Sequence, residues 1–143
     1  MQFKANNIDV NLRIDFEENK NKKAIKNKNK NNWLIVSVVY KVENKIISKK
    51  SPVLQVYELI ELRQWFDNIK NSEQLKPLDF LETSLNILYN DNILTVELCY
   101  ELSLYGYDLD ECTIFDLPLD KKCINSIIKE LDETISLVKP WDK

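Results

Sequence analysis

The side chains in this sequence that could do chemistry together are carboxylates. Glu97 and Glu101 lie four residues apart in an alternating run, and Asp108, Asp110 and Glu111 follow closely. Because a strand rises about 3.3 Å per residue, Glu97 and Glu101 would stand about 13 Å apart, too far to share a metal ion or a proton. Asp108 and Asp110 lie closer, but no twelve-residue calcium loop surrounds them. The acids favour a solvated strand face or an acidic binding surface over a catalytic centre.

The composition lacks histidine and has little glycine, two residue types on which many catalytic and nucleotide-binding motifs depend. The sequence contains no histidine, which excludes Ser-His-Asp and Cys-His relays and histidine-containing zinc sites. Its single glycine, Gly106, excludes a GxGxxG turn and a Walker loop, since both need several residues without a Cβ. We therefore expect a protein that is not an enzyme, with no catalytic, cofactor-binding or metal-binding residues and no cofactor. A carboxylate enzyme that binds a divalent metal remains the alternative from that class.

The net charge of −3 hides two halves of opposite sign. Residues 1–50 hold 12 Lys and Arg against 5 Asp and Glu, whereas residues 51–143 hold 8 against 18. A surface loop is predicted over 17–32, too polar to bury, and it carries Lys20, Lys22, Lys23, Lys26, Lys28 and Lys30. These lysines could contact phosphates, but the loop has no Arg for bidentate contacts and no aromatic for base stacking. A flexible loop is favoured, and a nucleic-acid-associated protein or a small adaptor stays open.

The acidic half is the better candidate for a partner. Tyr100 is expected to point inward, and Tyr105 and Tyr107 lie near the tip of the turn. Such a surface would suit a basic protein, because complementary charge speeds association and selects partners. The predicted partner-binding residues are Glu97, Glu101, Tyr105, Tyr107, Asp108, Asp110 and Glu111.

The cysteines and the hydropathy bear on the compartment. Cys99, Cys112 and Cys123 are odd in number, widely spaced and without a CxxC pair. We expect three free thiols in a reducing cytoplasm, with neither a disulfide framework nor a zinc site. The N-terminus has no apolar signal region, and no stretch reaches the roughly 20 apolar residues of a membrane span. A cytoplasmic protein without a membrane partner is predicted, and its oligomeric state stays open.

Periodicity indicates which elements carry these residues. Residues 8–16 alternate as a half-buried strand, 33–42 are apolar nearly throughout, and 46–53 form a further strand whose Pro52 suggests a sheet edge or strand end. From Val56 the apolar spacing changes to three and four residues, which predicts a helix of about four turns. Trp33, Trp65 and Trp141 are expected at or near the core.

The second half repeats the order of strands followed by a helix. One long strand or two short ones are predicted over 78–80 and 85–89, followed by a turn at 90–92 and strands at 94–104 and 112–117. Asp120 should cap a final helix that ends before Pro140. The order β-β-β-α-β-β-β-α predicts one α+β domain over 1–143. Its architecture is an antiparallel sheet or sandwich of about six to seven strands with two packed helices.

Three segments carry a family resemblance. Asn32-Trp33-Leu34 resembles the NWL signature of WapI-type immunity proteins. Residues 57–66, YELIELRQWF, are similar to that family's EL-x-x-L-x-x-W-L pattern, and Phe80-Leu81-Glu82 with Leu85 and Ile87 resembles its F-x-E-P-x-L-x-F strand. Thr83 replaces the usual proline. The resemblance spans about residues 3–141 in the same order of elements.

The resemblance implies a function that the composition alone does not provide. It implies a non-enzymatic cytoplasmic immunity protein that binds and neutralises the C-terminal domain of a cognate secreted bacterial toxin, often an RNase. The acidic surface would then cover a basic toxin surface and displace RNA by mimicking its charge. The matching residues are mainly packing positions, so they carry the fold rather than the site.

Overall fold

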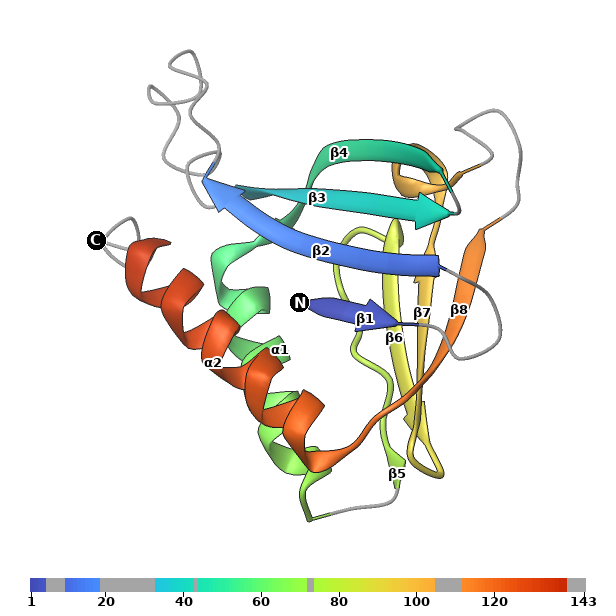
Figure 1. Cartoon of the computed structure of the whole chain (residues 1–143). Coiled ribbons are helices and arrows are strands. Elements are labelled where there is room, and N and C mark those ends of the chain that lie inside the picture. The colour runs from blue at the N-terminus through green and yellow to red at the C-terminus, as the bar shows by residue number, and fades with distance from the viewer. Residues whose placement is uncertain (5–9, 19–32, 43, 72–73, 105–111, 139–143) are drawn as a thin grey trace.

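Two antiparallel sheets and two helices make up the fold of the described chain (Figure 1). The structure is a computed structural model that describes residues 1–4, 10–18, 33–42, 44–71, 74–104 and 112–138. Sheet A contains, in spatial order, β1 (Gln2–Lys4), β2 (Val10–Glu18), β3 (Trp33–Val42) and β4 (Lys45–Gln55). Sheet B contains β5 (Gln74–Leu75), β6 (Leu85–Asn90), β7 (Ile93–Leu98) and β8 (Thr113–Pro118).

Sheet A is built around β3, as its continuous apolar run predicts. Leu34, Val36, Val38 and Tyr40 alternate on the buried face, and the strand pairs with both β2 and β4. Pro52 lies in β4, which pairs only with β3 and is therefore an edge strand. This agrees with the prediction from Pro52, because proline cannot donate a ladder hydrogen bond.

Sheet B is a meander, and its tight turn is formed by the Asp and Asn residues from which the turn was predicted. Asp91 and Asn92 join β6 to β7 with φ of 51° and 65°. Asn and Asp tolerate this left-handed backbone better than other non-glycine residues, so the turn forms without a glycine. Burial alternates along β6 and β7, which gives the sheet one face toward the core and one toward solvent.

The helices α1 (Val56–Ile69) and α2 (Lys121–Val138) lie beside each other on one side of the molecule (Figure 1). The Arg63 guanidinium of α1 contacts the Asp132 carboxylate of α2 at 2.8 Å. The carboxylate of Asp120 accepts the backbone N–H of Cys123 at 2.7 Å, so the predicted cap of the final helix is confirmed. One hydrophobic core joins α1, α2 and both sheets.

The first turn of α1 holds a buried carboxylate that organises two segments. Glu58 is 1% exposed, and its Oε1 accepts the backbone N–H of Gln55, the residue that caps the helix, at 3.0 Å. Its Oε2 accepts the backbone N–H of Leu81, also at 3.0 Å. Two turns later the Trp65 indole donates to the Lys76 carbonyl at 2.9 Å. Glu58 and Trp65 thus fasten the segment 76–81 to α1.

The predicted α+β class and the antiparallel pairing are confirmed. Eight strands are described rather than six to seven, because β1 and β5 are only three and two residues long and carry no readable alternation. The strand predicted around Leu78 and Phe80 was wrong, since residues 76–84 form no strand and are held by α1 instead. Glu17 and Glu18 belong to β2 rather than to the predicted loop.

The strand predicted over 94–104 was wrong in its second half. β7 ends at Leu98, and a short 3-10 helix, η2 (Tyr100–Leu102), follows. Tyr100 is 41% exposed, so its predicted inward orientation was also wrong. Trp65 is buried and Trp33 is half-buried, in agreement with the prediction, whereas Trp141 and the lysines of 20–30 lie outside the described residues.

Candidate functional site

The solvent-facing side of sheet B carries the first predicted site residue. Glu97 lies in β7 between Asn86 of β6 and Ile114 of β8, and these three residues form one row across the sheet. Glu97 is half-buried by its neighbours, and Ile114 is 57% exposed. In the next row, Thr95 donates a 2.8 Å hydrogen bond to the carboxylate of Asp116, which is itself exposed. The face combines carboxylates with exposed aliphatic side chains.

The second predicted residue lies just beyond the end of the same strand. Glu101 is exposed in η2, and its Oε2 accepts a hydrogen bond from the Ser84 hydroxyl at 3.1 Å. The Cys99 backbone N–H donates to the Ser84 carbonyl at 2.8 Å, so the two segments are joined at two points. Tyr100 precedes Glu101 and stands out to solvent. We call Glu97, Tyr100, Glu101, Ile114 and Asp116 the acidic face.

Five predicted site residues cannot be placed in this way. Tyr105, Tyr107, Asp108, Asp110 and Glu111 lie outside the described residues. Their part in a binding surface therefore stays a prediction. The described residues on either side of this segment are Leu104 and Cys112.

A disulfide joins Cys112 to Cys99 at the end of β7, which corrects the prediction of three free thiols. Cys99 and Cys112 are bonded, and of the three cysteines only Cys123 is free. The pairing follows from the antiparallel register: Leu98 of β7 lies opposite Thr113 of β8, so the residue after Leu98 meets the residue before Thr113. Because the predicted strand extended to Leu104, the sequence did not indicate that Cys99 and Cys112 would be neighbours.

The acidic face has a stronger signal in the sequence than strand alternation, namely an interval without lysine or arginine. Between Pro77 and Asp120, a stretch that contains β6, β7 and β8, no lysine or arginine occurs. The same stretch contains ten carboxylates: Asp79, Glu82, Asp91, Glu97, Glu101, Asp108, Asp110, Glu111, Asp116 and Asp120. Counting charge within this interval, rather than by halves of the chain, identifies Asp116, which the strand alternation alone did not single out.

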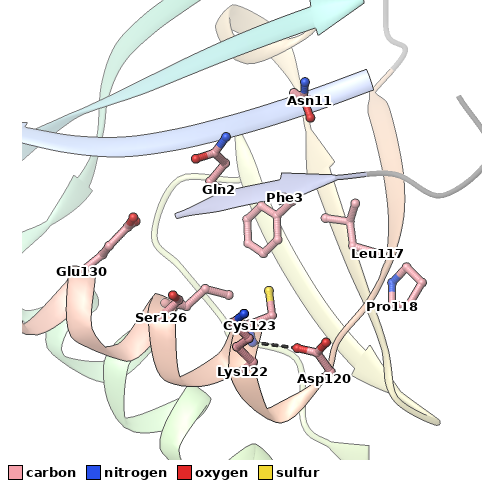
Figure 2. Close-up of a pocket in the computed structure, with 11 residues that line it drawn as sticks. Gln2, Phe3, Asn11, Leu117, Pro118, Asp120, Lys122, Cys123, Ser126 and Glu130 are labelled. Carbon is pink, nitrogen blue, oxygen red and sulfur yellow. Dashed lines mark hydrogen bonds between the residues drawn. The ribbon is translucent and has the colours of Figure 1, made fainter. Parts of the chain in front are cut away.

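A pocket in the described chain lies elsewhere, between β1, β8 and α2. Its volume is about 660 Å³, and Figure 2 shows Phe3 from β1, Leu117 from β8 and Cys123 from α2 around it. Its Asp120 caps α2, and its Glu130 pairs with the N-terminal ammonium. Burial, together with the nearby Asp120, raises the pKa of the Cys123 thiol above its ordinary value. A thiol that stays protonated is a poor nucleophile, so the pocket holds no activated group.

Glu130 gives this region a measurable pH dependence. Its carboxylate lies 2.7 Å from the fully buried Met1 ammonium, which also donates to the Ile14 carbonyl at 2.8 Å. Partial burial acts to raise the pKa of Glu130, but the hydrogen bond and charge of that ammonium, with Arg13, outweigh it and lower the pKa below 4.5. A carboxylate with a lowered folded-state pKa stabilises the fold above its unfolded-state pKa, and the contribution disappears as the pH falls through the folded-state value.

We therefore expect Glu130→Gln to lower the free energy of unfolding by about 1 kcal/mol at neutral pH, an effect reduced by the partial exposure of the carboxylate. The difference from the wild type should shrink as the pH falls below about 4.5 and through the lowered folded-state pKa of Glu130, in urea unfolding measured across the acid range. Glu133→Gln, an exposed acid on the same helix, is the control. A difference that does not depend on pH would contradict the ion pair.

Two further properties concern the described residues only. No group of three or more Cys, Asp or Glu side chains among them is placed to hold a metal ion. None of the described helices is long and apolar enough to cross a membrane.

The fold and the acidic face together describe a two-sheet α+β protein with a charged, aromatic-edged surface. The sequence model of the immunity protein WapI-like family matches residues 2–138, and the chain belongs to this family. Searches of curated proteins and of solved structures give no match. Four of the motif residues that first indicated the family, Leu34, Glu58, Trp65 and Phe80, are buried.

Proposed function

We propose that this immunity protein binds the C-terminal domain of a cognate secreted toxin in the cytoplasm and inhibits it without catalysis. The toxin domain is a nuclease with a basic substrate-binding surface. Membership of an immunity protein family supports a toxin-neutralising role. The finer statements about the partner, the compartment and the surface are our proposal.

The observation that carries the proposal is the charge of sheet B. Its outer face and the adjoining turn present Glu97, Glu101 and Asp116, and the stretch 77–120 to which they belong contains no lysine or arginine. A nuclease must hold the phosphates of its substrate with Lys and Arg. A protein surface of the opposite sign can occupy the same groups and exclude the nucleic acid.

The mechanism is competitive masking. Long-range attraction would bring the acidic face toward the basic cleft, and contact would then bury the aliphatic and aromatic side chains of this face. Ile114 supplies exposed apolar area at the end of the Glu97 row. No residue of the chain needs to react, which agrees with the absence of histidine from the sequence.

The test is a binding measurement with the purified toxin domain encoded beside this protein, in a catalytically inactive form. We expect Glu97→Lys/Glu101→Lys to lower the association rate about tenfold at low salt, with the difference shrinking as salt screens the charges. The control, Glu61→Lys/Glu133→Lys, makes the same charge change on exposed helix positions. An association rate equal to that of the control would place the interface elsewhere.

The wild-type protein provides the broader test. If it neither binds this toxin domain nor protects cells that co-express the active toxin, the proposed function is rejected. Inhibition of RNA cleavage by the wild type should rise in step with the fraction of toxin bound, because masking requires one contact to exclude the other.

A further inference from the structure

One residue of the acidic face has a backbone conformation that its side chain does not favour. Tyr100 has φ of 53°. The two other non-glycine residues described with positive φ, Asp91 and Asn92, form a hairpin turn in which such residues are common. A tyrosine in this region brings its Cβ toward its own carbonyl, which costs energy. Such outliers persist only where the surroundings fix them, and they concentrate at functional sites.

The surroundings of Tyr100 fix it from both sides. The Leu102 N–H donates to the Cys99 carbonyl, and the Ser103 N–H donates to the Tyr100 carbonyl, both at 3.1 Å. The Tyr40 hydroxyl of sheet A donates to the Leu102 carbonyl at 2.7 Å. The disulfide at Cys99 ties the start of the turn to β8. Hydrogen bonds within the turn, the Tyr40 hydroxyl of β3 and the disulfide to β8 thus hold this unfavourable backbone in place.

The result is a partly exposed tyrosine beside a carboxylate. Tyr100 is 41% exposed, one of the large side chains that the fold leaves accessible to solvent. Glu101 follows directly, with its carboxylate held by Ser84, and Glu97 and Ile114 lie on the adjoining sheet. Aromatic side chains dominate the binding energy of interfaces because they offer large contact area and lose little conformational freedom.

We propose that Tyr100 is the anchor residue of the toxin interface. It inserts into an apolar cleft of the basic partner whose rim carries Arg and Lys side chains. The charge around it argues for this occupant: the ring face attracts a guanidinium or ammonium, and the neighbouring Glu101 pairs with a second base. The inference rests on the proposed function, and it adds the residue that determines how long the complex lasts.

The test measures dissociation rates from the same inactive toxin domain. Tyr100→Ala should dissociate at least about tenfold faster than the wild type, since loss of an anchor acts mainly on dissociation. Tyr57→Ala is the matched control, because Tyr57 is an exposed tyrosine of similar exposure, 45%, on α1. It should dissociate within about twofold of the wild type.

Tyr100→Gly separates an anchor from a merely structural residue. Glycine adopts the left-handed backbone without the steric cost, so Tyr100→Gly should melt at a higher temperature than Tyr100→Ala, while binding weakens equally in both variants. A lower melting temperature for Tyr100→Gly than for Tyr100→Ala would contradict the backbone argument. If both variants dissociate like the wild type while Glu97→Lys/Glu101→Lys still slows association, the anchor is wrong and the proposed function stands. If the wild type does not bind at all, the proposed function itself fails.

Discussion

Glu58→Ala is expected to lower the free energy of unfolding by about 3 kcal/mol, because it strips two backbone N–H groups of a shared buried acceptor. Those groups belong to Gln55 at the start of α1 and to Leu81 in the segment before β6. Each loses a partly buried hydrogen bond to the Glu58 carboxylate, and Glu58 itself is 1% exposed. Urea unfolding of the purified protein measures the loss.

Glu61→Ala is the matched control for this prediction. Glu61 lies on the exposed side of the same helix, so its replacement should change the free energy of unfolding by less than about 0.5 kcal/mol. Glu58→Gln keeps one acceptor oxygen and should fall between the two. Equal stabilities for Glu58→Ala and Glu61→Ala would mean that the carboxylate does not hold the two segments.

Removing the disulfide is the second change with a large expected effect. Cys99→Ala/Cys112→Ala should lower the free energy of unfolding by about 3 kcal/mol, because the bond closes a loop across a sequence separation of 13 in the unfolded chain. Reduction of the wild type with a dithiol should have a similar effect. Cys123→Ala removes the free thiol instead and serves as the control.

Thiol counting provides the sharper check on this bond. Alkylation of the denatured, unreduced protein should find one reactive thiol per chain, and three would contradict the disulfide. Disulfides are rare in reducing compartments. Alkylation inside cells, before lysis, therefore also tests the proposed cytoplasmic location, because a bond that is present there must resist the thiol pool.

The sequence predicted the elements whose patterns are local. The continuous apolar run of β3, the three-and-four spacing of α1 and the Asn90-Asp91-Asn92 turn each reflect one element's own geometry. The Asp120 cap is local in the same way. These features need no knowledge of what packs against them, which is why their prediction was confirmed.

The features that failed depend on contacts between elements. Apolar and polar residues continue to alternate through Cys99 to Leu104, but the strand stops because Ser84, Thr113 and Tyr40 bind the backbone or side chains of that segment. The Cys99–Cys112 bond likewise requires the register of two strands. Of the predicted site, Glu97 could be placed from alternation alone, whereas the exposure of Tyr100, which was predicted to point inward and was not among the site residues, could not.

The buried position of Glu58 has a consequence for how such a protein can change over generations. Glu58 and Trp65, two of the residues that identify the family, act as internal fasteners, and none of the described motif residues lies on the outer face of sheet B. Under the proposed function, recognition and folding thus depend on separate sets of side chains. The acidic face can then accept substitutions that follow a changing toxin, while the same buried fasteners keep the scaffold folded.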